Sequence, residues 1–313
     1  MTGTAGTPIV AALLKNPQFT ITALTRADST ASMPTGVQVA KIDYADTSSI
    51  TAAMKGQDML IITMSVHAPK ETQYQLIDAA IAAGVSWILP NTYGQEVTEA
   101  AGRDTYLGPP MRAVQQYIEE KAEGKTSWIG IACGFWYEFS LVGMYERFGF
   151  DLKEKRATLY DEGEVPLSTS TWAQLGRVVA ALLSLPVERL GGEKAVLSDW
   201  KNKYVHFDSF CVTQKQMLES LQRVKPEWQW KVDKIPSKKF YAEGLEQLQK
   251  GDRIGFSKML YSRMFYPEDQ PGNAVKHFGL DNEKLGVPEE DLDEATKGAV
   301  EMWKKGVFEV TYN

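Results

Sequence analysis

The first residues of the chain have the types and spacing of a phosphate-binding turn. Gly3 and Gly6 flank Thr4 and Ala5, and a helical pattern begins directly after them. Glycines let the backbone approach a pyrophosphate closely, and the unpaired amides at a helix N-terminus attract its charge. A run rich in glycine and threonine is also common at frayed chain ends. The order of the elements that follow favours the phosphate-binding turn.

Arg26 and Asp43 follow two short strand-like runs, residues 19–25 and 37–42. The first run ends without an adjacent acidic residue. A carboxylate at this place binds the ribose 2′-hydroxyl of NAD, whereas an arginine suits the 2′-phosphate of NADP. We therefore expect the cofactor to be NADP(H). The alternative is that Arg26 is an ordinary solvated surface side chain.

Tyr117 and Lys121 have the Tyr-x-x-x-Lys spacing of the catalytic pair in ordinary short-chain dehydrogenases. They lie at the end of a predicted helix, residues 111–123. In a strand–helix unit, the C-terminal end of the helix lies at the edge of the sheet opposite to the ligand. We therefore predict an exposed helix end and not a catalytic pair.

The elements that must position these residues alternate between strand and helix. Strands are predicted at residues 19–25, 37–42, 58–64, 85–89 and 127–132, and helices at residues 8–14, 48–55, 73–83 and 111–123. This order indicates an α/β fold with a doubly wound parallel Rossmann sheet. Residues 1–150 are expected to form the NAD(P)-binding domain. Residues 151–313 are expected to form a smaller α+β substrate or cap region, mostly helical towards its end, that partly returns to the sheet.

Composition narrows the classes of function. The 313 residues include 34 Lys and Arg against 40 Asp and Glu, a net charge of −6, without a long basic run. This argues against nucleic acid or an anionic membrane as the main partner. Cys133 and Cys211 lack metal-ligand spacing, so we predict reduced thiols and no metal site. Neither a signal peptide nor a membrane-spanning segment is predicted, and we expect a cytoplasmic protein.

Several motifs, in order, resemble the NmrA-like and isoflavone-reductase-like proteins, atypical relatives of the short-chain dehydrogenases. They comprise residues 76–85, residues 87–94 and the run Cys-Gly-Phe-Trp-Tyr-Glu at 133–138, which is similar to fungal members. Residues 275–300 are also similar to the C-terminal helices of this family. The resemblance implies a Rossmann domain, a preference for NADP(H) and, in the reductases, hydride delivery to small aromatic or enone-type substrates. Other members bind the cofactor as sensors without known catalysis.

The resemblance also implies which residues form the site. Those expected to bind the cofactor are Gly3, Thr4, Ala5, Gly6, Arg26, Asp43, Ser65, Val66, Gln73 and Asn91. Those expected to line a substrate pocket are Tyr93, Phe135, Trp136 and Tyr137. A catalytic residue is not identified, and the candidates are His67, which follows Ser65 and Val66 beside the expected nicotinamide, and Tyr93.

The sequence departs from the family in two places. Met1 falls where the family has its first glycine, so the strand expected before that glycine is missing and we expect an N-terminally truncated chain. Residues 19–25 and 58–64 would then flank a gap with unpaired backbone groups. Pro110 or Met111 occupies the place where the reductases carry a lysine. Three functions therefore stay open: a reductase, a non-catalytic NADP(H)-sensing regulator that binds a protein partner, and a cofactor-free product.

Overall fold

Helices and strands alternate along the first half of the chain. The computed structural model describes residues 3–65 and 68–307. The elements of the first half are α1 (Gly6–Leu13), β1 (Ile21–Arg26), β2 (Val37–Ile42), α2 (Thr47–Met54), β3 (Met59–Ile61), α3 (Lys70–Ala83), β4 (Trp87–Leu89), α4 (Glu99–Asp104), α5 (Gly108–Ala122) and β5 (Ser127–Ala132). Local signals set their ends. Gly84 takes a φ of 80° to close α3, and the Asp46 side chain accepts a hydrogen bond from the Ser48 amide to begin α2.

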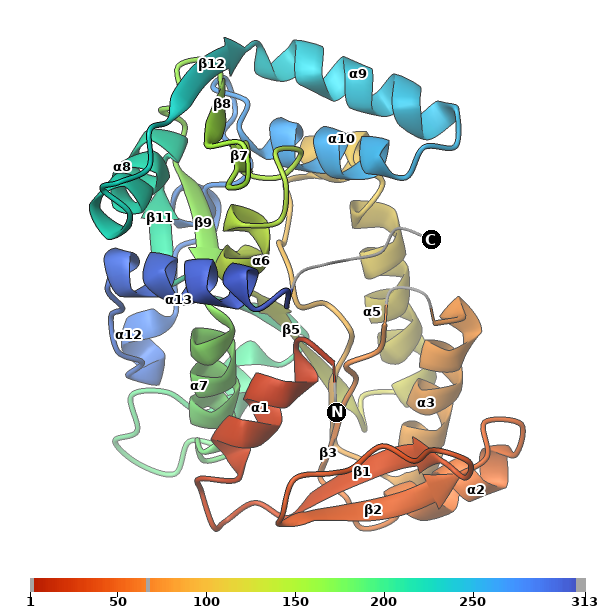
Figure 1. The fold of residues 1–313 in the computed structure, drawn as a ribbon. Helices are drawn as coiled ribbons and strands as arrows, with labels where there is room; N and C mark the ends of the chain where they lie inside the picture. Colours follow the sequence, from red (N-terminus) through yellow and green to blue (C-terminus); the bar gives the residue numbers. More distant parts are fainter. Residues whose placement is uncertain (1–2, 66–67, 308–313) are drawn as a thin grey trace.

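The strands of this half divide between two sheets. A four-stranded sheet has the order β10-β5-β4-β3, and all of its pairs are parallel. Its strand β10 (Lys203–His206) comes from the second half of the chain, which thus returns to the sheet. Strands β1 and β2 form a separate parallel pair, at the bottom of the molecule in Figure 1. The α/β fold class with parallel strands is confirmed, but the sheet is split.

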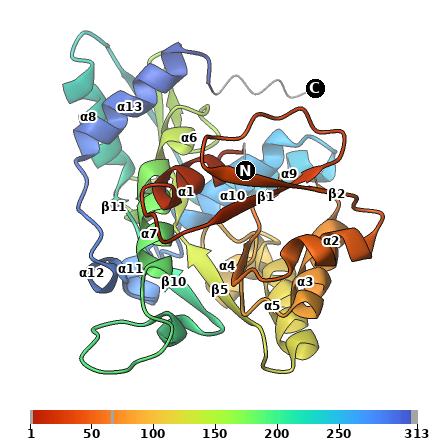
Figure 2. The ribbon, with the colours of Figure 1, turned by 90° about the horizontal axis from the view of Figure 1, so that it is seen from below.

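Helices cover both faces of the four-stranded sheet, as the doubly wound class requires. Helices α1 and α7 (Trp172–Leu183) pack on one face against Ile129 and Ile131 of β5. Helices α2, α3 and α5 pack on the other face, where Trp128 of β5 points. Figure 2 shows the two groups of helices on opposite sides. Successive β5 side chains alternate between the faces, and all six residues of the strand are buried.

The rest of the described chain contains two small sheets with helices beside them. Its further elements are β6 (Phe135–Trp136), α6 (Tyr137–Leu141), β7 (Phe150–Asp151), β8 (Arg156–Tyr160), β9 (Leu167–Ser170), β11 (Phe210–Val212), α8 (Gln214–Val224), β12 (Lys231–Ile235), α9 (Ser237–Gln249), α10 (Ile254–Met264), α11 (Ala274–His277), α12 (Asn282–Leu285) and α13 (Leu292–Lys304). The sheets have the orders β11-β9-β6 and β12-β8-β7. Strand β12 lies where the sequence suggested mostly helix. It is a largely exposed edge strand whose only partner among the described residues is β8, and its sequence therefore has little apolar pattern.

A cavity of about 1190 Å³ separates β1 from β3 and is lined by residues of both strands. It explains why β3 differs from expectation. The sequence predicts a strand over residues 58–64, but β3 covers only Met59–Ile61, and all three residues are only partly buried. Along the described chain, no helix is both long and apolar enough to cross a membrane.

Candidate functional site

The carboxyl ends of β3 and β4 bring three predicted residues together. The Asn91 side-chain amide donates a hydrogen bond to the Met64 carbonyl (3.1 Å), and the Asn91 backbone N–H donates to Oε1 of Gln73 (3.1 Å). Ser65, the residue after Met64, is exposed at the same edge. Gln73 therefore orients the loop after β4. Val66 and His67 lie outside the described residues.

The N-terminus of α1 has the properties of an anion site. Ala5 provides no side-chain cap, and the first turn contains no acidic residue. Gly3 and Thr4 are exposed, whereas Ala5 and Gly6 are buried. A Cβ added at Gly3 would meet no atom within 4 Å, so there is open space beside the backbone. Uncapped amides and the positive end of the helix dipole favour a phosphate group here.

Two cations lie at the carboxyl ends of β1 and β2. Arg26 is mostly exposed and forms an ion pair with Asp28 (Nε to Oδ1, 3.5 Å). Nζ of Lys41 donates to the Ser29 carbonyl (2.8 Å) and approaches the Arg26 carbonyl (3.4 Å). The carboxylate of Asp43 accepts a hydrogen bond from the Ala45 amide (2.9 Å) and so stabilises the turn after β2. Sequence reasoning missed Lys41, because only the parallel register with β1 brings it to Arg26.

Tyr93 and Cys133 lie together in the core beneath α1 and α7. The Tyr93 hydroxyl is buried, and among the described residues it has no hydrogen-bond partner. Burial, with a smaller effect from Cys133, raises the pKa of Tyr93 far above its ordinary value. Burial also raises the pKa of the Cys133 thiol to about 12. Both groups therefore stay protonated near neutral pH and are poor proton acceptors.

The other residues expected in a substrate pocket follow β5, and two of them contact helices from the end of the chain. The ring of Phe135 stacks on Tyr261, with the ring centres 3.9 Å apart. The Tyr137 side chain is fully buried, and its hydroxyl is 2.6 Å from Oγ1 of Thr296. Trp136 is half-buried and packs against the cluster that contains Tyr93. Of the expected pocket residues after β5, Trp136 is thus nearer to solvent than Tyr137.

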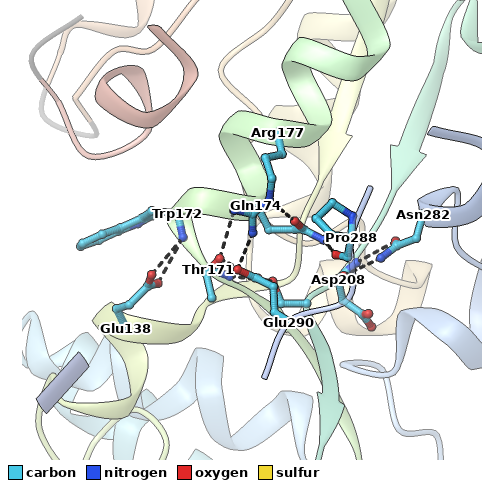
Figure 3. Close-up of polar contacts among 10 residues, drawn as sticks. Glu138, Thr171, Trp172, Gln174, Arg177, Asp208, Asn282, Pro288 and Glu290 are labelled. Atoms are coloured by element: carbon cyan, nitrogen blue, oxygen red, sulfur yellow. Dashed lines mark hydrogen bonds and ion pairs between the residues drawn. The ribbon is translucent and has the colours of Figure 1, made fainter. Parts of the chain in front are cut away.

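Two carboxylates meet the N-terminus of α7 (Figure 3). Both oxygens of Glu138 accept the backbone N–H of Trp172 at 3.2 Å. Burial, with a smaller effect from the negative charge of Glu290, raises the pKa of Glu138 to about 7. Backbone hydrogen bonds to the carboxylate lower this pKa but do not offset the effect of burial. Glu290 itself accepts hydrogen bonds from Thr171 (2.8 Å) and from Arg177. Glu138 was part of the motif at 133–138, but its sequence context gave no sign of this contact.

Tyr117 and Lys121 do not form an activated pair. The Tyr117 hydroxyl donates a hydrogen bond to Oδ1 of Asp78 (2.7 Å). Burial and this bond raise the pKa of Tyr117 to about 12. Lys121 holds its ammonium 5.6 Å from the centre of the Tyr117 ring. A catalytic tyrosine needs a lowered pKa, so the geometry agrees with the structural interpretation.

The described residues contain no cluster of His, Cys, Asp and Glu that could hold a metal ion. Both cysteines are free thiols. His206 contacts Glu96 (Nε2 to Oε2, 2.5 Å) and stacks on the ring of Phe278, with ring centres 4.8 Å apart. These contacts hold the His206 side chain between Glu96 and Phe278.

The chain is similar in sequence and in fold to known proteins. The family model described as the NmrA-like family matches residues 1–168. The oxidoreductase aprR of Aspergillus flavus is 30% identical over 297 residues, which cover 93% of this chain and 94% of that protein. A crystal structure of isoflavone reductase has a TM-score of 0.68 at 19% identity and covers 95% of this chain and 96% of its own. The NADPH complex of Escherichia coli quinone oxidoreductase QOR2 has a TM-score of 0.66 at 19% identity, with coverage of 96% and 97%.

Proposed function

The chain belongs to the NmrA-like family, and on that premise we propose that it is an NADP(H)-dependent oxidoreductase that reduces a small aromatic or enone-type metabolite. Two observations carry the cofactor assignment: the cations Arg26 and Lys41 at the carboxyl ends of β1 and β2, and the uncapped N-terminus of α1. The substrate class follows from the resemblance to the reductases. The relative aprR, which is named an oxidoreductase, supports the reaction type.

The donor set suits each charged part of the cofactor. The amides at Thr4, Ala5 and Gly6 would hold the pyrophosphate, because within the described part of the chain no side chain caps α1 and its first turn has no acidic residue. The guanidinium of Arg26 and the ammonium of Lys41 would hold the 2′-phosphate, which is absent from NADH. When bound, NADPH would supply the hydride.

The loops after β3 and β4 would position the nicotinamide end. Asn91 is held by Gln73 and by the Met64 carbonyl, so the backbone at this edge is ordered before any ligand arrives. A preorganised edge costs less entropy on binding. His67 and Val66 stay candidates for this region from sequence alone.

We do not assign a tyrosine as the donor of the proton that the substrate takes up after the hydride. The pKa of Tyr117 is raised to about 12, and burial raises the pKa of Tyr93 further. Among the described residues, no cation lowers the pKa of either hydroxyl. We therefore expect the substrate carbanion or enolate to take its proton from water at the open carboxyl edge of the sheet.

One observation favours a second candidate, a non-catalytic NADP(H)-sensing regulator that binds a protein partner. Tyr117 is hydrogen-bonded to Asp78 and is not activated by Lys121. Tight NADPH binding, with no oxidation of NADPH by a panel of enones, quinones and phenolic compounds, would favour the regulator. Turnover with any member of the panel would favour the reductase.

The replacement Arg26→Ala tests the cofactor assignment. NADPH affinity should fall by roughly ten-fold or more, since a charge-assisted contact contributes about 1.5–3 kcal/mol, whereas NADH affinity should change little. Isothermal titration with both cofactors measures the two effects. Arg156→Ala is the matched control, because Arg156 pairs with Asp233 on a separate sheet. Equal losses for NADPH and NADH would contradict the role of Arg26.

A further inference from the structure

A histidine and a carboxylate meet at the carboxyl edge of the four-stranded sheet. His206 is the last residue of β10 and lies beside Ala132, the last residue of β5. Gly94 forms a parallel bridge to Ala132, so the chain after β4 runs along the end of β5 before it reaches Glu96. Parallel sheets bind their ligands at this edge, to which Asn91 also belongs. The two side chains therefore lie on the side of the sheet where a substrate is expected.

The carboxylate of Glu96 orients the ring of His206. Nε2 of His206 is 2.5 Å from Oε2 of Glu96, and the other side of the contact is the ring of Phe278, which stacks on the imidazole. The side chains of His206 and Glu96 are 15% and 31% exposed, so both are shielded and still reach solvent. A carboxylate that holds one ring nitrogen leaves the other, Nδ1, to exchange a proton.

Gln95 places an amide without partners beside this pair. Its side-chain Nε2 and Oε1 are both buried, and among the described residues neither has a hydrogen-bond partner. A cavity of about 10 Å³ is lined by Gln95, Glu96 and His206. One water molecule needs roughly this volume and two to four polar partners. Buried polar groups are nearly always satisfied, so the amide indicates a bound water at this place.

The other charged and titratable groups around His206 are already engaged. The carboxylate of Asp281 accepts the backbone N–H of His206 (3.0 Å) and forms an ion pair with Lys284 (Oδ1 to Nζ, 2.8 Å). Tyr204 lies on the same strand, and burial raises the pKa of its hydroxyl. Glu96 is thus the carboxylate that contacts the imidazole ring itself.

We propose that Gln95, Glu96 and His206 hold one water molecule and supply the proton that follows the hydride in the reduction. This inference rests on the proposed function and adds a proton source to it. Once an enone has gained a hydride at its β-carbon, the α-carbon of the enolate forms a C–H bond with a proton of the water, whose O–H bond breaks. The water takes up the Nδ1 proton of the imidazolium in the same step. The neutral imidazole then regains a proton from solvent.

The pH dependence of turnover tests the relay, with trans-chalcone as the aromatic enone and saturating NADPH. In the parent protein, kcat should fall as pH rises through the titration of His206, because the imidazolium loses its proton. His206→Gln should lower kcat roughly 100-fold at acidic pH and remove this dependence, with NADPH affinity unchanged. Glu96→Gln should move the midpoint of the fall to lower pH, because the neutral amide no longer stabilises the imidazolium.

His277→Gln is the matched control. Nε2 of His277 is 2.9 Å from the carbonyl oxygen of Asp269, so this histidine is held by the backbone and its replacement should keep the parent profile. An unchanged kcat and pH profile in His206→Gln would refute the relay and leave the reductase proposal intact. Turnover of neither trans-chalcone nor any other compound in the panel would refute the reductase proposal and the relay with it.

A measurement without turnover tests the water site. In the parent protein, nuclear Overhauser contacts should connect a long-lived water to the side-chain amide protons of Gln95. Gln95→Met keeps the length of the side chain without its amide, so it should lose these contacts and lower kcat with trans-chalcone by roughly ten-fold. Absence of the water contacts in the parent protein would overturn the proposal.

Discussion

Replacing Glu138 by Gln should remove a specific dependence of stability on pH. Glu138 is only 6% exposed and accepts the Trp172 amide with both carboxylate oxygens. Burial raises the pKa of Glu138 from 4.5 to about 7. Between pH 4.5 and about 7, Glu138 is therefore protonated in the folded state and ionised in the unfolded state. The stability from this group is fully present below pH 4.5 and is lost as pH rises through 7.

The size of the effect follows from the same numbers. The difference between a pKa of 4.5 in the unfolded chain and about 7 in the folded chain corresponds to roughly 3 kcal/mol, at about 1.36 kcal/mol per pH unit. Most of this should be lost between pH 5 and pH 8. Glutamine is neutral at every pH and keeps a carbonyl oxygen that can accept the Trp172 amide. Glu138→Gln should therefore lack this loss and be more stable than the parent protein at pH 8.

Urea unfolding at pH 5 and pH 8 provides the measurement. The decrease in free energy of unfolding between these pH values should be smaller in the variant by about 2–3 kcal/mol. Glu99→Gln is the control, because the Glu99 side chain is 78% exposed and pairs with Arg103 on the surface. Parallel pH profiles for the parent protein and Glu138→Gln would refute the assignment of a raised pKa to this carboxyl group.

Two further predictions concern Tyr117 and the contact of α1 with α7. Tyr117→Phe should leave NADPH-dependent turnover nearly unchanged and cost about 1 kcal/mol of stability from the lost bond to Asp78. A fall in turnover of two orders of magnitude would mean that Tyr117 is catalytic. A Cβ at Gly176 would lie 2.4 Å from the Pro8 carbonyl oxygen, so Gly176→Ala should displace α1 and lower the melting temperature by several degrees, at roughly 2–4 °C per kcal/mol. An unchanged melting temperature would show that α1 is not held this closely.

Local patterns in the sequence were sufficient for most elements of the first half. Strands β2 (Val37–Ile42) and β5 (Ser127–Ala132) begin and end where their apolar runs do. Helix α3 stops where Gly84 can adopt a positive φ. These signals act within a few residues, so they can be identified without knowledge of the tertiary fold. The α/β class follows from their alternation.

Strand β12 shows where local patterns are not enough. Its residues Lys231–Ile235 are polar and mostly exposed, and only the pairing with β8 makes them a strand. Strand β3 shows the converse, since the apolar run at residues 58–64 predicts a longer strand than Met59–Ile61. The burial of β3 depends on what lies along its open edge, and the residues of β3 do not specify this.

The sequence by itself determined the residue types at the site: glycines before a helix, Arg26 after a strand, and Gln73 and Asn91 near the ends of their elements. Only the tertiary structure decided which of them meet. Lys41 joins Arg26 through the register of two parallel strands, and Glu138 acquires its raised pKa through burial against α7. Both effects depend on distances between segments far apart in the chain, which no local pattern encodes.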